Sequence, residues 1–136
     1  MNNLELQQLM TDSANNAVLT SQEEFDITLD FSPESIEQVD TIIVGFLDRF
    51  KAQALEDKAI FTICNIYGAY IGETFKKQAG GEWFLDQSNP DAPSVYIALN
   101  EHTYAFAGIC YERLVNDSTI SVQDYFDKAV AANISH

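Results

Sequence analysis

Few side chains in this sequence have the chemistry of a nucleophile, a general base or a zinc ligand. The histidines are His102 and His136, and the cysteines are Cys64 and Cys110. A Ser–His–Asp or Cys–His site would depend on His102, because His136 is the last residue and no Gly-x-Ser-x-Gly motif is present. Both cysteines lie in apolar segments without a Cys-x-x-Cys pair, which is typical of buried, reduced thiols. We therefore predict no catalytic residues and no metal site.

Phosphate-binding and calcium-binding loops are not indicated either. Gly80-Gly81 is expected to follow a helix and precede a strand, whereas a phosphate cradle needs a glycine-rich turn before a helix N-terminus. The acidic residues of the first third lack the Asp-x-Asp-x-Asp-Gly spacing of a calcium loop. We expect no cofactor.

Two carboxylates and an indole form the best candidate for a small-ligand site. Glu73 and Glu82 flank the Gly80-Gly81 turn, and Trp83 follows directly. A carboxylate pair can carry out acid–base chemistry. The same residues also fit capping and packing roles at a surface rim, so both interpretations stay open.

The charge of the chain limits the classes of partner that it can bind. Its 136 residues include 21 acidic and 7 basic ones, for a net charge of −14, and every charged residue before Arg49 is acidic. With 46% hydrophobic residues the chain can build a core, which argues against disorder. Nucleic acids and anionic membranes are disfavoured because binding them needs clustered Lys and Arg. A recognition face for a basic partner would comprise Glu23, Glu24, Asp26, Asp30, Glu34, Glu37 and Asp40.

The elements that would position these residues follow from periodicity. We predict a short, loosely docked helix within residues 2–18, a polar linker over 20–24, and a strand over 25–31, where apolar and polar residues alternate. Ser32-Pro33-Glu34 is a helix-start signal for a helix to about Ala54. A second helix is expected over about 56–78, apolar almost all round and therefore central.

The remainder of the chain predicts a small sheet. Strands are expected over 82–85, 94–99 and 103–106, with a turn at 100–102, then a short helix over 107–115 and a last helix from Ser121. The fold class is therefore α+β, a small, mostly antiparallel sheet packed with four to five helices around one central buried helix. Residues 1–136 are predicted to form a single domain, with 1–22 a loosely packed N-terminal segment.

Two stretches resemble a family of small bacterial domains, the domain of unknown function 3806. Gly68-Ala-Tyr-Ile-Gly72-Glu73 with Gly80-Gly81-Glu82-Trp83 is similar to that family's Gly-x-x-x-Gly-Glu helix and Gly-Gly-x-Trp exit. The segment from Tyr104 to Asn116, with the helix that follows it, resembles the family's C-terminal segment, and the likeness covers about residues 31–131. It implies a compact helix–sheet domain with no established activity. It also draws attention to Glu73, Trp83 and Arg113, with Arg113 paired to Glu73 or Glu82.

These observations favour a non-catalytic interaction module in the cytoplasm, with a basic protein as partner, for example an immunity-type protein that neutralises a basic bacterial toxin. No segment has the length of a membrane helix or a signal peptide. The alternatives are a ligand-binding domain or small enzyme with a pocket around Glu73, Trp83, Tyr104 and Arg113, an acidic mimic of nucleic acid, and a charge that only keeps the domain soluble.

Overall fold

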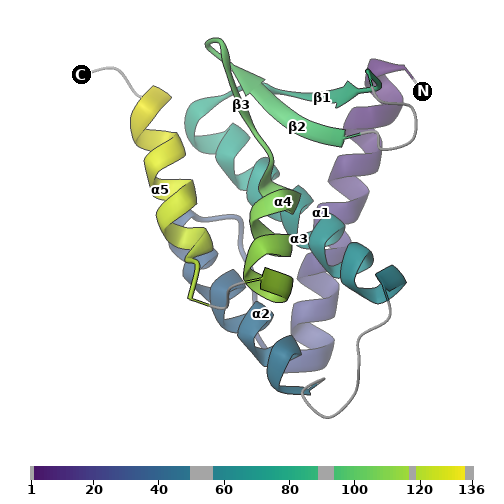
Figure 1. Cartoon of the computed structure of the whole chain (residues 1–136), viewed down its shortest axis with the longest axis vertical. Helices are drawn as coiled ribbons and strands as arrows, with labels where there is room; N and C mark the ends of the chain where they lie inside the picture. The colour runs from purple at the N-terminus through teal and green to yellow at the C-terminus, as the bar shows by residue number, and fades with distance from the viewer. Residues whose placement is uncertain (1, 50–56, 89–93, 117–118, 134–136) are drawn as a thin grey trace.

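The computed structural model describes residues 2–49, 57–88, 94–116 and 119–133 (Figure 1). In these ranges the α-helices are α1 (Asn3–Phe25), α2 (Ile36–Arg49), α3 (Asp57–Ala79), α4 (Phe106–Tyr111) and α5 (Val122–Asn133). Strands β1 (Glu82–Asp86), β2 (Ser94–Leu99) and β3 (His102–Tyr104) form one antiparallel sheet in the order β1-β2-β3. The predicted α+β class is confirmed.

The central helix of the fold is α3, as predicted. It packs against α1, α4, α5 and the 3-10 turn Pro33–Ser35 that precedes α2. Tyr67, Tyr70 and Phe75 of α3 are fully buried. A helix with neighbours on several sides needs apolar residues around most of its circumference, which explains the nearly continuous apolar run.

Helix α1 corrects the prediction for the start of the chain. Instead of a short, loose helix and a linker, one helix extends to Phe25 and packs along α3. Its buried stripe has helical spacing and consists of Leu6, Met10, Ala14, Ala17 and Ser21. Small residues dominate the later part of this stripe, so the helices approach closely while the sequence shows little apolar periodicity.

The predicted strand over residues 25–31 is wrong. Phe25 ends α1, and the connector from Asp26 to Ser32 belongs to no strand among the described residues. Leu29 is nevertheless buried, and the backbone N–H of Phe31 donates to Tyr70 Oη at 2.8 Å. The alternating pattern therefore reflects a connector in which every second side chain is at least partly buried, without a hydrogen-bonded neighbour strand.

The start of α2 follows the predicted signal. Ser32 accepts a hydrogen bond from the Ser35 backbone N–H at its Oγ, 3.2 Å away, and Pro33 begins the 3-10 turn that leads into α2. Val39 and Ile43 of α2 are fully buried. The expected end near Ala54 lies outside the described residues.

Two glycines of α3 explain how the sheet and α4 pack against it. A Cβ on Gly72 would lie 2.1 Å from Cη2 of Trp83, and one on Gly68 would lie 2.6 Å from the backbone of Ala107. Neither position could carry a side chain without displacing the element that packs against it. Gly80 follows α3 with a φ of +94°, which an L side chain rarely adopts, and the chain then enters β1.

The hairpin and the C-terminal helices also match the predictions in outline. Asn100 and Glu101 form the β2–β3 turn with φ angles of 52° and 70°, the left-handed conformation of a tight hairpin turn. The predicted helix over 107–115 is α4 followed by a π-helical turn, Glu112–Asn116. Ser121 caps α5 by accepting the Asp124 backbone N–H at 3.1 Å.

Candidate functional site

Glu73 and Trp83 lie together, as the sequence suggests. Trp83 Nε1 donates to Glu73 Oε2 at 2.9 Å, and Thr11 Oγ1 donates to Glu73 Oε1 at 3.1 Å. Lys76 Nζ lies 3.6 Å from Glu73 Oε2 and donates to Gln7 Oε1 at 2.9 Å. Both oxygens of the Glu73 carboxylate thus accept hydrogen bonds, one from α1 and one from β1, and Lys76 adds an ion pair within α3.

The side chain of Glu73 connects three elements, α1, α3 and β1. The Glu73 side chain is 18% exposed, and each of its hydrogen bonds joins α3 to another element. Thr11 was not predicted as a partner of Glu73, nor Gln7 as a partner of Lys76, because each contact spans more than sixty residues of sequence. Each Glu73 oxygen accepts one hydrogen bond from another element, so this carboxylate stabilises the packing of α1 and β1 on α3.

A small cleft lies beside Trp83. It has a volume of about 170 Å³ and is lined by Asn2, Asn3, Leu6, Trp83, Phe84 and Leu85. Sites for drug-sized ligands have volumes of about 300–1,000 Å³. Of the four predicted pocket residues, only Trp83 lines this cleft.

Tyr104 belongs to an aromatic cluster. Its ring centroid lies 5.2 Å from that of Phe75, 6.0 Å from that of Phe106 and 6.4 Å from that of Tyr125. Its hydroxyl accepts a hydrogen bond from Asn133 Nδ2 at 2.7 Å. Tyr104 therefore joins β3 to α5 and forms part of the packing between the sheet and the helices.

Arg113 pairs with Asp40, which corrects the expected pairing with Glu73 or Glu82. Arg113 Nε lies 3.3 Å from Asp40 Oδ1 but makes no hydrogen bond within the described residues, so this contact is an ion pair. Arg113 Nη1 also donates to the carbonyl of Ile120. The structure thus brings Glu73 and Trp83 together and holds Arg113 at the junction of α2 and α5.

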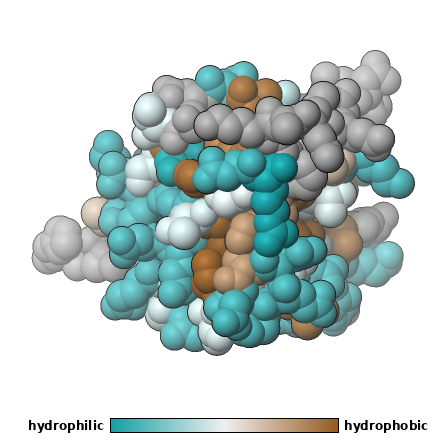
Figure 2. Space-filling model, turned by 90° about the horizontal axis from the view of Figure 1, so that it is seen from below, coloured by the Kyte–Doolittle hydropathy of each residue, from teal (hydrophilic) through white to brown (hydrophobic). Residues whose placement is uncertain are grey.

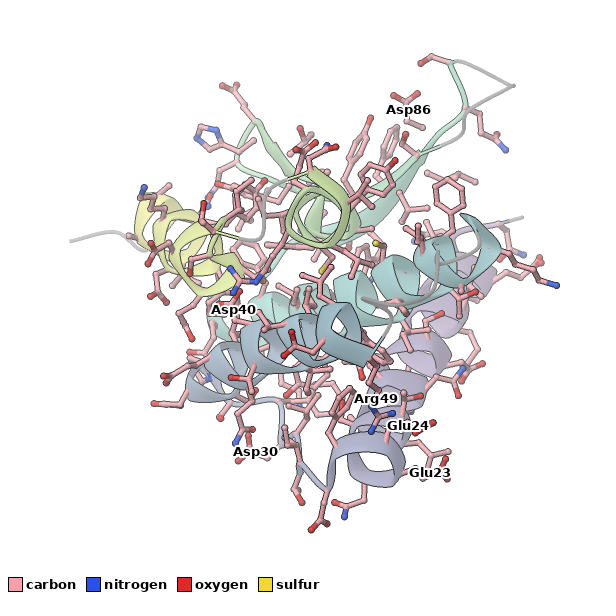
Figure 3. The ribbon with its side chains drawn as sticks, turned by 60° about the horizontal axis from the view of Figure 1, so that its bottom comes forward. Glu23, Glu24, Asp30, Asp40, Arg49 and Asp86 are labelled. Atoms are coloured by element: carbon pink, nitrogen blue, oxygen red, sulfur yellow. The ribbon has the colours of Figure 1, made fainter. Side chains whose placement is uncertain are left out.

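Asp40 is used inside the fold and does not belong to the predicted recognition face. Its carboxylate accepts the backbone N–H groups of Val122 at 2.8 Å and Gln123 at 2.9 Å, at the N-terminus of α5. Figure 3 shows Asp40 between α2 and α5, away from Glu23, Glu24 and Asp30. The sequence gives no signal for this contact, because Asp40 and α5 are separated by some eighty residues.

The remaining acidic residues of that face are exposed. We call them the acidic surface, and they are Glu23, Glu24, Asp26, Asp30, Glu34 and Glu37. They follow the end of α1, the connector and the start of α2, and in Figure 3 the labelled Glu23, Glu24 and Asp30 lie along one edge of the molecule.

Two residues of the acidic surface form hydrogen bonds or an ion pair with neighbouring residues. Arg49 Nη1 donates to Glu24 Oε2 at 3.0 Å, and the Arg49 guanidinium lies 4.4 Å from the Phe25 ring centroid. Asp30 accepts the Ser32 N–H at 3.0 Å, and its hydrogen bonds with Ser32 lower the pKa of the Asp30 carboxyl below 3.8. Asp30 is therefore ionised at neutral pH.

The thiols have the character predicted for them. Cys64 and Cys110 are free and buried. Burial raises the pKa of the Cys64 thiol to about 12 and that of Cys110 well above 9.0. A thiolate is the reactive form of cysteine, so both side chains act as small apolar groups at neutral pH. Among the described residues, no group of three or more His, Cys, Asp or Glu side chains has the arrangement of a metal site.

Comparisons with known proteins add no relative. No family model matches the chain, and neither a curated protein nor a solved structure is significantly similar to it. The resemblance to the bacterial family therefore stays a prediction based on its motifs. Across the described ranges, no helix has the length and apolar character needed to cross a membrane.

Proposed function

We propose that this protein is a non-catalytic interaction domain that binds a basic protein through the acidic surface. The observation that carries the proposal is the exposure of all six of its carboxylates, of which Glu24 alone forms an ion pair in the described part of the chain. Asp40, which the fold uses, is the one member of the predicted face that is not exposed.

The arrangement suits electrostatic recognition. Neighbouring carboxylates of one sign raise the local concentration of a cationic partner and speed its encounter with the surface. Seen from the end where α1 finishes, hydrophilic residues cover most of the coloured surface, with a smaller hydrophobic area near its centre (Figure 2). A polar rim around an apolar centre is typical of protein–protein interfaces.

The concrete form that we favour is an immunity-type protein in the cytoplasm of a bacterium, which neutralises a basic toxin. An acidic domain of this kind would associate quickly with a cationic toxin and would lose much of that advantage at high salt. The alternative small-ligand pocket has less support, because Tyr104 and Arg113 are engaged at other positions in the fold.

A capture experiment with matched variants tests the proposal. The full chain is immobilised and exposed to lysate of its native host at low and high salt. One variant removes four charges from the acidic surface (Glu23→Gln, Asp26→Asn, Glu34→Gln and Glu37→Gln). The control removes four exposed charges elsewhere (Asp12→Asn, Glu101→Gln, Glu112→Gln and Asp127→Asn), so that both variants have the same net charge.

The proposal predicts that a basic protein is retained at low salt by the native chain and the control but not by the acidic-surface variant. Retention that is equal for both variants would show that total charge, not this surface, is responsible. Failure to recover a basic partner at low salt would contradict the proposal.

A further inference from the structure

One face of the sheet carries mostly exposed side chains, although Phe84 on this face also lines the cleft with Asn2, Asn3 and Leu6 at the start of α1. The register places Glu82, Phe84 and Asp86 of β1 opposite Ala98, Tyr96 and Ser94 of β2. Their neighbours Trp83 and Ile97 point the other way and are buried against α3. In Figure 1 the helices extend from that inner side of the sheet. We call the opposite side, formed by Glu82, Phe84, Asp86, Ser94, Tyr96, Ala98 and Thr103, the outer sheet face.

An aromatic pair lies on the outer sheet face. The ring centroids of Phe84 and Tyr96 are 5.6 Å apart, with 32° between the ring planes. Phe84 is 50% exposed. This cross-strand pair stabilises the pairing of β1 with β2, and the exposed half of the Phe84 ring is accessible to a partner.

Carboxylates flank this aromatic pair. Tyr96 Oη donates to Asp86 Oδ2 at 2.7 Å, and the Ser88 N–H donates to Asp86 Oδ1 at 2.9 Å. These bonds lower the pKa of the Asp86 carboxyl below 3.8 and keep it ionised. Glu82 is exposed two positions before Phe84 on the same strand. The outer sheet face contains no lysine or arginine.

This combination selects for a cation. An arginine or lysine binds favourably over an aromatic ring and pairs with carboxylates beside it. An acidic partner would be repelled by Glu82 and Asp86, and a purely apolar one would have to desolvate them without compensation. Charge complementarity therefore favours a basic side chain that stacks on Phe84.

We propose that the outer sheet face is a second contact surface, where an arginine or lysine of the basic partner stacks on Phe84 and pairs with Glu82 and Asp86. The inference rests on the proposed function, because it takes the partner to be a basic protein. It goes further in locating a contact on the sheet, whereas the acidic surface begins at the opposite end of α1 from the one that contacts β1 (Figure 1).

A defined peptide probes this surface. Acetyl-(Arg-Gly)₄-amide is titrated into the ¹⁵N-labelled full chain at low salt, and binding is followed by amide chemical shifts. The matched variants are Phe84→Ala and Phe61→Ala, since Phe61 is also an exposed aromatic, on α3, with an exposure of 56%. Loss of one cation–aromatic contact at an exposed site weakens binding about two- to fivefold. We expect that loss for Phe84→Ala, little change for Phe61→Ala, and the largest shifts in β1 and β2.

A second pair of variants guards against a structural effect of Phe84→Ala. Glu82→Gln is expected to weaken peptide binding, whereas Glu101→Gln in the β2–β3 turn is expected to leave it unchanged. Equal affinities for Phe84→Ala and Phe61→Ala, with no shifts in β1 or β2, would overturn the sheet contact.

The four-charge variant of the acidic surface separates the two proposals. If it weakens peptide binding while Phe84→Ala does not, the acidic surface stands and the outer sheet face fails. If Phe84→Ala weakens binding and the four-charge variant does not, the sheet contact stands and the proposed role of the acidic surface fails. No detectable binding of the peptide to the native chain would overturn both.

Discussion

Asp40 and Arg113 form an ion pair in which the carboxylate also caps another helix. The side chains are only 14% and 13% exposed, and Asp40 accepts two backbone N–H groups at the start of α5. A negative charge at a helix N-terminus is stabilising, and here it is placed by a different helix, α2. One carboxylate thus fixes the relative positions of α2, α5 and the π-helical turn that carries Arg113.

Asp40→Ala is therefore expected to be strongly destabilising. It removes the helix cap and leaves the largely buried Arg113 without its counter-charge, at a combined cost of about 2–4 kcal/mol. The free energy of unfolding, measured with urea, checks this. The control is Glu37→Ala, an exposed acid on the same helix, which should change stability by less than about 0.5 kcal/mol. Equal losses for the two variants would contradict the cap.

The side chains of Glu73 and Trp83 are expected to be energetically coupled through their hydrogen bond. Glu73→Gln removes the charge and Trp83→Phe removes the indole donor. A double-mutant cycle of urea unfolding should give a coupling of about 1–2 kcal/mol, as for a hydrogen bond to a charged group. A cycle between Trp83→Phe and Asp12→Asn serves as control, because Asp12 makes its side-chain bond to Gln8. Additive effects in the first cycle would show that the hydrogen bond between Glu73 and Trp83 contributes nothing to the free energy of unfolding.

Gly72→Ala tests the packing of Trp83 on α3. The added methyl would overlap the indole, so Trp83 or the sheet must shift, at about 1–3 kcal/mol. Gly108→Ala in α4 is the matched control, since its methyl would meet only the Ala105 Cβ at 3.5 Å. Relief of the helix penalty of glycine should make that variant neutral or stabilising by up to about 1 kcal/mol. Thermal unfolding of the two proteins distinguishes these outcomes, and a stabilised Gly72→Ala would contradict the geometry.

Alkaline pH is expected to destabilise the protein. Burial raises the folded-state pKa of Cys64 from 9.0 to about 12 and that of Tyr67 from 10.0 to about 12. Between the unfolded-state and folded-state pKa values, the unfolded chain has lost these protons and the folded chain still holds them. The contribution of the two groups to the free energy of unfolding is therefore complete below pH 9 and is lost as the pH rises towards 12. The urea concentration at which half of the protein is unfolded should decrease as the pH is raised from 8 to 11.

The variant Tyr67→Phe isolates one of these groups. It lacks the titrating hydroxyl, although it also loses the 2.8 Å bond to Ser21. Its stability should be lower than that of the native chain at pH 8 and should fall less steeply above pH 10. Parallel pH profiles of the two proteins would show that Tyr67 titrates as it does in the unfolded state.

Elements with strong local signals were predictable from the sequence. Ser32-Pro33 starts α2 because capping and a fixed proline φ act within one turn, and the apolar circumference of α3 reflects burial on most sides. These cues depend on residues near one another in the chain.

The predictions were wrong where contacts between residues distant in the sequence determine the local structure. Ala14, Ala17 and Ser21 make the buried face of α1 from small residues, and Ser21 satisfies its hydroxyl on Tyr67, so its periodicity is weak. The connector around Leu29 alternates like a strand but hydrogen-bonds to Tyr70 instead of a neighbouring strand. For the candidate site, the pairing of Glu73 with Trp83 was local enough to anticipate.

The most direct test of the central claim is an amide chemical-shift map of the ¹⁵N-labelled chain on addition of the captured basic partner. We predict that one cluster of perturbed amides lies between Glu23 and Glu37, beside any cluster in β1 and β2 from the outer sheet face, and that raising the salt concentration weakens the association. A basic partner that perturbs only amides outside this segment, with an affinity unchanged by salt, would contradict recognition through the acidic surface.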